Sequence, residues 1–295
     1  MMVRFPHEVR VVRARDGQVL AAQVAGEGPA VLLANGIGVR APGFARFVER
    51  LRRRHRLILW DYRGIGGSRV PGDRGDLSMG RHALDALDLL DALGEDRAAV
   101  VGWSMGVPVG LEMIRVAPTR VAAFAALFGS AGPAFRAGFP PVVARGLEGV
   151  VRLCAREPRP SQAVMDLAAA FPGLTHRVLS AIRFTGQDSD RALFAADVES
   201  VASAPREAYF RTLAALARHD ARDVLPRVRC PALVIGGGRD LLTPPAASRA
   251  MAEAIPGARL LILPRATHFG LLEEPGPVLD ALEELLGSDP PRGDR

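Results

Sequence analysis

Six short apolar runs, spread along the chain, constrain its fold more than any other feature. They lie at residues 30–34, 57–60, 98–101, 122–128, 232–235 and 260–263. Helical periodicity separates the first three runs, over residues 43–54 and 78–93. Continuous apolar strands that alternate with helices form a parallel sheet that is covered on both faces. We therefore expect an α/β fold with a doubly wound, mostly parallel sheet, preceded by two strand-like segments at residues 9–14 and 19–24.

The alternation of strands and helices stops between residues 133 and 229. This interval has no strand-like run, and its Ala- and Leu-rich helical segments lie at residues 142–156, 161–171, 174–184 and 206–219. A length of 295 residues suits one large domain with an insertion. We therefore expect an α/β core of residues 1–132 and 230–286, a helical insertion at residues 133–229 and a flexible C-terminal tail at residues 287–295.

The predicted helix over residues 78–93 carries Asp85, Asp88 and Asp91 three residues apart. Three carboxylates at this spacing suggest a charged site, but leucines recur with the same period on another face of the helix. A surface helix has this amphipathic pattern. We therefore expect the three carboxylates to lie on a solvated face.

The basic character of the chain comes without a nucleic-acid-binding motif. Its net charge is +6, and all 38 basic residues are arginine. The densest basic run, at residues 50–56, has neither an RNP-like aromatic pattern nor zinc-finger spacing. We expect a small-molecule substrate and no nucleic-acid partner.

The sequence also has few features that indicate membrane insertion, secretion or disulfide formation. No stretch approaches the roughly 20 apolar residues of a membrane span, and charges interrupt the first residues where a signal peptide needs an apolar run. The two cysteines, Cys154 and Cys230, are too few for a secreted disulfide framework or a Cys-based zinc site. We expect a soluble, cytoplasmic protein.

A Gly-x-Ser-x-Gly pentapeptide at residues 102–106 is the most specific motif in the chain. It directly follows the apolar run 98–101 and precedes a helical stretch. In this strand–turn–helix context the motif is a nucleophile elbow, whose glycines permit a tight turn that exposes the serine. The pattern predicts Ser104 as the nucleophile.

A serine nucleophile needs a positioned base, and the base needs an acid to orient it. Of the six histidines, only His268 lies just after the last strand-like run, at the sheet edge expected for Ser104. The acid should lie between them in the chain. Asp240 follows the run 232–235, whereas the loop one strand earlier, residues 129–133, has no carboxylate. The sequence therefore predicts His268 as the base and Asp240 as the acid.

Negative charge that forms on a carbonyl oxygen needs preorganised hydrogen-bond donors. One candidate donor is the backbone N–H of Met105, at the start of the helix. The second should come from the loop at residues 35–38, where Ile37 N–H is the predicted donor. A plain glycine turn is the alternative interpretation of this loop. A dinucleotide fingerprint is excluded because no third glycine follows at the required spacing.

Together, these motifs resemble those of the α/β-hydrolase fold superfamily. The resemblance runs from about residue 8 to residue 286, and its matching segments are 35–38, 61–68, 102–106, 237–240 and 266–268. It implies a mostly parallel sheet of eight strands, with a helical cap over Ser104 inserted after the sixth strand. It also implies that Asp61, Arg63 and Ser68 have structural rather than catalytic roles.

Asn35 departs from the superfamily pattern, because most relatives carry His-Gly where this chain has Asn35-Gly36. The oxyanion donor is a backbone group, so activity should survive, but the side chain shapes the pocket. Asparagine here resembles the Asn-x-Leu-Gly version in enol-lactone hydrolases of aromatic catabolism. We expect Asn35, Trp103 and Phe269 to line a largely apolar substrate pocket.

The sequence thus predicts a serine hydrolase that cleaves an ester or related acyl bond of a small, largely apolar substrate, without cofactor or metal. A cofactor-free enzyme of another class stays open: an enol-lactonase, C–C hydrolase, perhydrolase, haloperoxidase or acyltransferase. A ligand-binding pseudoenzyme is a further alternative. Epoxide hydrolase and haloalkane dehalogenase are disfavoured because relatives of those types carry Asp where this chain has Ser104. Substrate, acyl-chain length and oligomeric state are not encoded in any motif.

Overall fold

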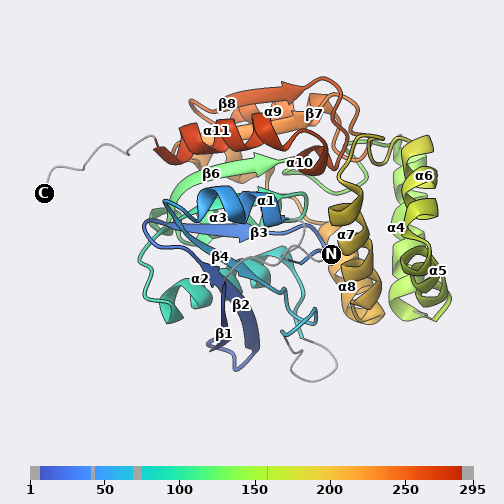
Figure 1. Ribbon diagram of the computed structural model, residues 1–295, viewed down its shortest axis with the longest axis horizontal. Helices are drawn as coiled ribbons and strands as arrows, with labels where there is room; N and C mark the ends of the chain where they lie inside the picture. Colours follow the sequence, from blue (N-terminus) through green and yellow to red (C-terminus); the bar gives the residue numbers. More distant parts are fainter. Residues whose placement is uncertain (1–6, 41–43, 69–74, 158, 288–295) are drawn as a thin grey trace, which may run out of the picture.

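Eight strands form one sheet in the computed structural model, which describes residues 7–40, 44–68, 75–157 and 159–287 (Figure 1). The strand order is β1-β2-β4-β3-β5-β6-β7-β8. β2 pairs antiparallel with β1 and β4, and all other neighbours are parallel. The strands are β1 (Glu8–Arg13), β2 (Val19–Ala25), β3 (Ala30–Ala34), β4 (Arg56–Trp60), β5 (Ala98–Trp103), β6 (Val121–Leu127), β7 (Ala232–Gly237) and β8 (Arg259–Leu263). The predicted eight-stranded, mostly parallel sheet is confirmed.

Helices cover both faces of the sheet, as the apolar runs predict. Successive side chains of a strand point to opposite faces, so Leu32 and Val100 join one buried apolar cluster while Leu33 and Val101 join the other. Helices α2 (Met79–Ala92), α3 (Gly106–Val116) and α9 (Pro245–Ala254) pack against the first cluster. Helices α1 (Ala45–Leu51), α10 (Gly270–Glu273) and α11 (Pro275–Gly287) pack against the second.

Between β6 and β7 the chain forms α-helices and no strand in the part that the structure describes. These inserted helices are α4 (Pro141–Arg156), α5 (Arg159–Ala170), α6 (Pro172–Ala181), α7 (Arg191–Ser203) and α8 (Arg206–Leu216). In Figure 1, α7 and α8 lie nearer to the sheet, and α4, α5 and α6 lie farther from it. The sequence predicts the other four helices but not α7.

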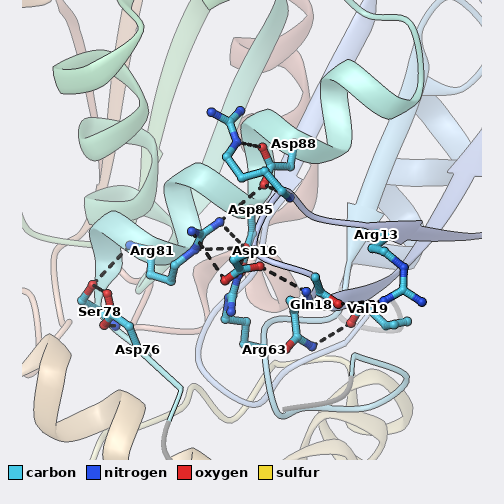
Figure 2. A network of polar contacts seen from close by, with 12 residues as sticks. Arg13, Asp16, Gln18, Val19, Arg63, Asp76, Ser78, Arg81, Asp85 and Asp88 are labelled. Atoms are coloured by element: carbon cyan, nitrogen blue, oxygen red, sulfur yellow. Dashed lines mark hydrogen bonds and ion pairs between the residues drawn. The ribbon is translucent and has the colours of Figure 1, made fainter. Parts of the chain in front are cut away.

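The carboxylates of α2 do not form the solvated face that their spacing suggests. Asp85 and Asp88 are buried, and only Asp91 is exposed. Figure 2 shows Asp85 between Arg63 and Arg81, both of which donate hydrogen bonds to its carboxylate. The prediction was wrong because helical spacing shows which residues share a face, not whether that face meets water or a buried arginine.

The described part of the chain ends with α11. Gly287 is the last residue of α11, and the remainder of the predicted tail, residues 288–295, lies outside the described residues. None of the helices in the described part of the chain is both long and apolar enough to cross a membrane.

Candidate active site

Ser104 occupies the sharp turn between β5 and α3, with a backbone φ of +52°. A residue with a side chain rarely adopts this left-handed region, so the surrounding structure must hold it there. A Cβ added at Gly102 would lie 2.4 Å from the carbonyl oxygen of Gly106. A Cβ added at Gly106 would lie 2.0 Å from the carbonyl oxygen of Ala34. The two glycines therefore allow the close approach of strand, turn and helix on which the elbow depends.

His268 lies in the loop between β8 and α10, and its Nε2 is 2.9 Å from the Oγ of Ser104. The indole N–H of Trp103 donates to the carbonyl oxygen of His268 over 3.2 Å. The adjacent Thr267 donates from its backbone N–H and its hydroxyl to the carboxylate of Glu273. These bonds hold the backbone around the imidazole, so His268 is positioned by its own loop and by the elbow.

Asp240 follows β7, and its carboxylate contacts the other side of the imidazole. Its Oδ2 lies 2.9 Å from Nδ1 of His268 and accepts a 2.6 Å hydrogen bond from the hydroxyl of Thr243. Its Oδ1 accepts from the backbone N–H groups of Leu242 and Thr243. A carboxylate at Nδ1 favours the tautomer with its proton on that atom, which leaves Nε2 free to accept the proton of Ser104.

Burial and polar contacts act in opposite directions on the Asp240 carboxyl. Burial by itself raises the pKa, whereas the neighbouring imidazole of His268 and the hydrogen bonds from His268 and Thr243 lower it. The net result is a pKa below the usual value of 3.8. Asp240 is therefore ionised at neutral pH and can balance a positive charge on His268.

The loop at residues 35–38, after β3, is connected to α7. Gly38 has a φ of +73°, and its carbonyl oxygen accepts a 2.9 Å hydrogen bond from the hydroxyl of Ser200. The backbone N–H groups of Ile37 and Met105 donate to no residue that the structure describes. Both predicted oxyanion donors are thus free to bind a ligand oxygen.

The three residues predicted to line a substrate pocket differ in their surroundings. Asn35 and Trp103 are buried, whereas Phe269 is partly exposed. The ring of Phe269 packs against Trp103 on one side and against Phe194 of α7 on another, with centroid distances of 5.7 and 5.6 Å. The structure therefore brings Trp103 and Phe269 together next to His268, in an aromatic cluster that reaches the inserted helices.

Asn35 lies outside this aromatic cluster. It lines a cavity of about 170 Å³ beside β2 and β4, together with Arg40 and Asp61, and Ser104 does not line it. Ligand pockets are usually larger, about 300–1,000 Å³. The Oδ1 of Asn35 is buried and has no hydrogen-bond partner among the described residues.

Three residues that position the site were not predicted from the sequence: Thr243, Glu273 and Ser200. Thr243 carries a local signal, because it stands three residues after Asp240 in a polar turn. Glu273 binds Thr267, six residues before it, and also accepts a 2.6 Å hydrogen bond from the backbone N–H of Gly186, 87 residues away. Ser200 lies 162 residues from Gly38. No local pattern could reveal the contacts with Gly186 and Gly38.

The structure thus joins Ser104, His268 and Asp240 by two contacts at one edge of the sheet. A hydroxyl beside an imidazole that a carboxylate orients is an arrangement capable of nucleophilic attack on a carbonyl carbon. Across the described ranges, no group of three or more His, Cys, Asp or Glu side chains could hold a metal ion.

Comparison with known proteins identifies the family. The family model described as alpha/beta hydrolase fold matches residues 29–275. The chain is 30% identical to the pimeloyl-[acyl-carrier protein] methyl ester esterase of Chromobacterium violaceum over 270 residues, which cover 90% of this chain and 98% of that protein. The chain belongs to the alpha/beta hydrolase fold family.

Solved structures agree with this assignment. The enol-lactonase from Burkholderia xenovorans LB400 matches with a TM-score of 0.79 and 26% identity, covering 95% of this chain and 100% of that one. A thermophilic esterase from Thermogutta terrifontis matches with a TM-score of 0.76 and 26% identity, covering 96% and 98% of the two chains. These relatives support a hydrolase activity for the chain.

Proposed function

We propose that this protein is a serine hydrolase that cleaves an ester bond of a small, largely apolar substrate through an acyl-enzyme intermediate. The observation that carries the proposal is the pair of 2.9 Å contacts from His268, one to Ser104 Oγ and one to Asp240 Oδ2. Two of the similar proteins are named as esterases, which supports the ester class.

In the proposed acylation step, Ser104 Oγ bonds to the substrate carbonyl carbon while His268 Nε2 takes its proton. The Asp240 carboxylate stabilises the imidazolium, and the N–H groups of Ile37 and Met105 donate to the oxyanion. His268 then protonates the leaving alcohol as the C–O bond breaks. In deacylation, His268 takes a proton from water as the water oxygen attacks the acyl carbon. The bond between that carbon and Ser104 Oγ then breaks, His268 returns the proton to Ser104, and the carboxylic acid leaves.

We also propose that residues 133–229 act as a cap over the nucleophile. Helix α7 supports this role because Ser200 binds the carbonyl oxygen of Gly38, while Phe194 packs against Phe269. One helix therefore spans the loop of the proposed oxyanion donor and the loop of the proposed base. Its aromatic contacts favour an apolar acyl group.

Two measurements test the proposal. A fluorophosphonate probe should label the wild-type protein stoichiometrically at Ser104 and should not label Ser104→Ala. A series of p-nitrophenyl esters should show kcat/KM rising from acetate to a short or medium acyl chain, since each buried methylene contributes about 0.8 kcal/mol. Absence of labelling would refute an activated serine, and labelling without ester hydrolysis would refute the ester class.

Lactone hydrolysis is a second candidate, favoured by the enol-lactonase among the similar structures, which matches 95% of this chain at 26% identity. The same serine chemistry would open a lactone ring, with the leaving oxygen kept on the acyl chain. Faster hydrolysis of an enol-lactone than of its open-chain methyl ester would favour this candidate, and the reverse order would reject it.

A further inference from the structure

Helices α4, α5 and α6 are here called the outer helices. Their outward faces carry a concentration of exposed apolar side chains. Ten of the fifteen large apolar side chains that are exposed in the described ranges belong to this segment. They are 47% to 73% exposed, and they are Val142, Val143, Val150, Leu153, Val164, Leu167, Phe171, Leu174, Val178 and Ile182. Single exposed apolar residues are ordinary, but a concentration of them marks an interaction site.

These side chains form an outward stripe on each helix. Apart from the adjacent pair Val142 and Val143, successive members on or at the end of one helix are three, four or seven residues apart, which places them on one side of it. The inward sides are already occupied, because α4 packs on α8, and α5 and α6 pack on α7. Figure 1 shows the outer helices as the layer farthest from the sheet. The exposed stripes are therefore not covered by the part of the chain that the structure describes.

Positive charge accompanies the apolar stripes. The outer helices and their ends carry six exposed arginines, none of which forms an ion pair with a described residue: Arg145, Arg152, Arg156, Arg159, Arg177 and Arg183. The same segment exposes only two described carboxylates, Glu157 and Asp166. Its third acidic residue, Glu148, is buried and pairs with Arg136.

We propose that the outer helices dock on the surface of an anionic lipid bilayer. Amphipathic helices with arginines beside an apolar face lie in the interface, where apolar side chains enter the acyl boundary and arginines bind lipid phosphates. The charge disfavours a second copy of this chain, because a two-fold interface sets the same surface against itself and would bring arginines together without matching carboxylates. An acidic protein would form ion pairs with the arginines but would not bury ten apolar side chains on three helices.

Vesicle sedimentation tests the proposal with the full chain. Vesicles with 30% phosphatidylglycerol in phosphatidylcholine should bind the protein at least tenfold more strongly than phosphatidylcholine alone, and binding should weaken as salt is raised. The double variant Leu167→Glu, Phe171→Glu should bind at least tenfold more weakly than the wild type. Its control is Val11→Glu, Val116→Glu, which charges two valines that are 70% and 51% exposed away from the outer helices and should bind with no more than a small loss.

A second pair of variants isolates the charge. Arg145→Gln, Arg152→Gln, Arg156→Gln should lower binding to the anionic vesicles at least tenfold. The control is Arg53→Gln, Arg54→Gln, Arg249→Gln, which removes the same charge from exposed residues elsewhere and should lower binding by less than threefold. Retained fluorophosphonate labelling of Ser104 will show that each variant is folded.

Four results would overturn the proposal. They are no binding to anionic vesicles, equal binding to neutral vesicles, equal losses in the variants and their controls, and a dimer in light scattering that Leu167→Glu, Phe171→Glu dissociates. The last would mean that a second copy covers the stripes. Binding to an acidic protein but to no vesicle would likewise reject the bilayer.

Discussion

Helices α3 and α5 are similar in length, but they differ greatly in how many of their residues are buried. α3 has 11 residues and buries nine of them, whereas α5 has 12 residues and buries none. α3 packs against β3, β5 and β6, and α5 packs against other inserted helices. The region packed on the sheet can therefore hold a serine in a strained turn, whereas the outer surface of the inserted region stays exposed.

Helix α7 connects the two regions. Asp190, at its start, donates from its backbone N–H to the carbonyl oxygen of Leu272 over 3.1 Å, and Ser200 contacts Gly38 near its end. The other inserted helices reach the sheet mainly through α7 and α8. The comparison therefore predicts that changes in the core alter chemistry and global stability, whereas changes on the outer helices alter neither.

The largest effect is expected at Ser104, His268 and Asp240. Ser104→Ala and His268→Ala should each lower kcat by several orders of magnitude, and the double variant should be scarcely worse than either, because residues that act as a unit are not additive. Asp240→Asn should lower kcat by about 10⁴-fold. Leu153→Ala, on α4, should leave kcat within about twofold. Steady-state ester hydrolysis measures all four, and losses that multiply in the double variant would contradict a shared mechanism.

Packing provides the next contrast. Phe124→Ala should lower the free energy of unfolding by about 3–5 kcal/mol, because the ring is fully buried in β6 and its removal leaves a cavity. Leu167→Ala, at a side chain 62% exposed on α5, should change it by less than about 0.5 kcal/mol. Urea unfolding followed by circular dichroism compares the two variants. A large loss at Leu167 would mean that something covers the outer helices in solution.

The pH dependence of stability tests the inserted region, because Asp197 is buried in α7. The side chain is 2% exposed, neither oxygen has a partner among the described residues, and burial raises its pKa well above 3.8. The unfolded chain therefore loses this proton near pH 4 while the folded chain keeps it, so stability falls as pH rises above 4. Asp197→Asn should remove this proton-linked loss, so the variant should lose less stability than the wild type as the pH rises from 4.5 to 8. Urea midpoints from pH 4.5 to 8 measure it, with exposed Asp166→Asn as the control, and parallel profiles for Asp197→Asn and wild type would contradict it.

His82 gives the core the opposite pH dependence. Burial and the positive charge of Arg63 lower the pKa of His82 to about 3, and neither ring nitrogen has a hydrogen-bond partner in the described structure. Below pH 6.5 the unfolded chain binds a proton at His82 and the folded chain does not. Stability therefore decreases as the pH is lowered from 6.5 to 3. The loss should reach about 1.4 kcal/mol at pH 5.5.

The ring of His82 packs 4.9 Å from that of Tyr62, so His82→Phe preserves an aromatic contact and removes the proton site. Urea unfolding of this variant should lose less stability than the wild type between pH 7 and 5.5. An unchanged slope would place the acid sensitivity elsewhere in the molecule.

Much of the core and its candidate site follows from local patterns. The apolar runs predict every parallel strand, because a strand covered on both faces must be continuously apolar. The flanking glycines predict the turn at Ser104, because Gly-x-Ser-x-Gly between a strand and a helix is a local signature of such a turn. His268 and Asp240 follow from their places after strands, because parallel strands end at one edge of the sheet.

The remaining features depend on residues far apart in the chain, so only the tertiary structure decides them. Asp85 lies on a helix whose spacing fits water or burial equally, and Arg63, 22 residues away, makes its surroundings a buried ion pair. α7 is weakly amphipathic because Asp197 and Ser200 share its buried face with apolar residues, so periodicity does not reveal it. The sequence by itself determined the sheet and the order of Ser104, Asp240 and His268, because sterics and periodicity are local. The fold alone decided which polar groups are paired, because burial and charge depend on neighbours that only folding brings together.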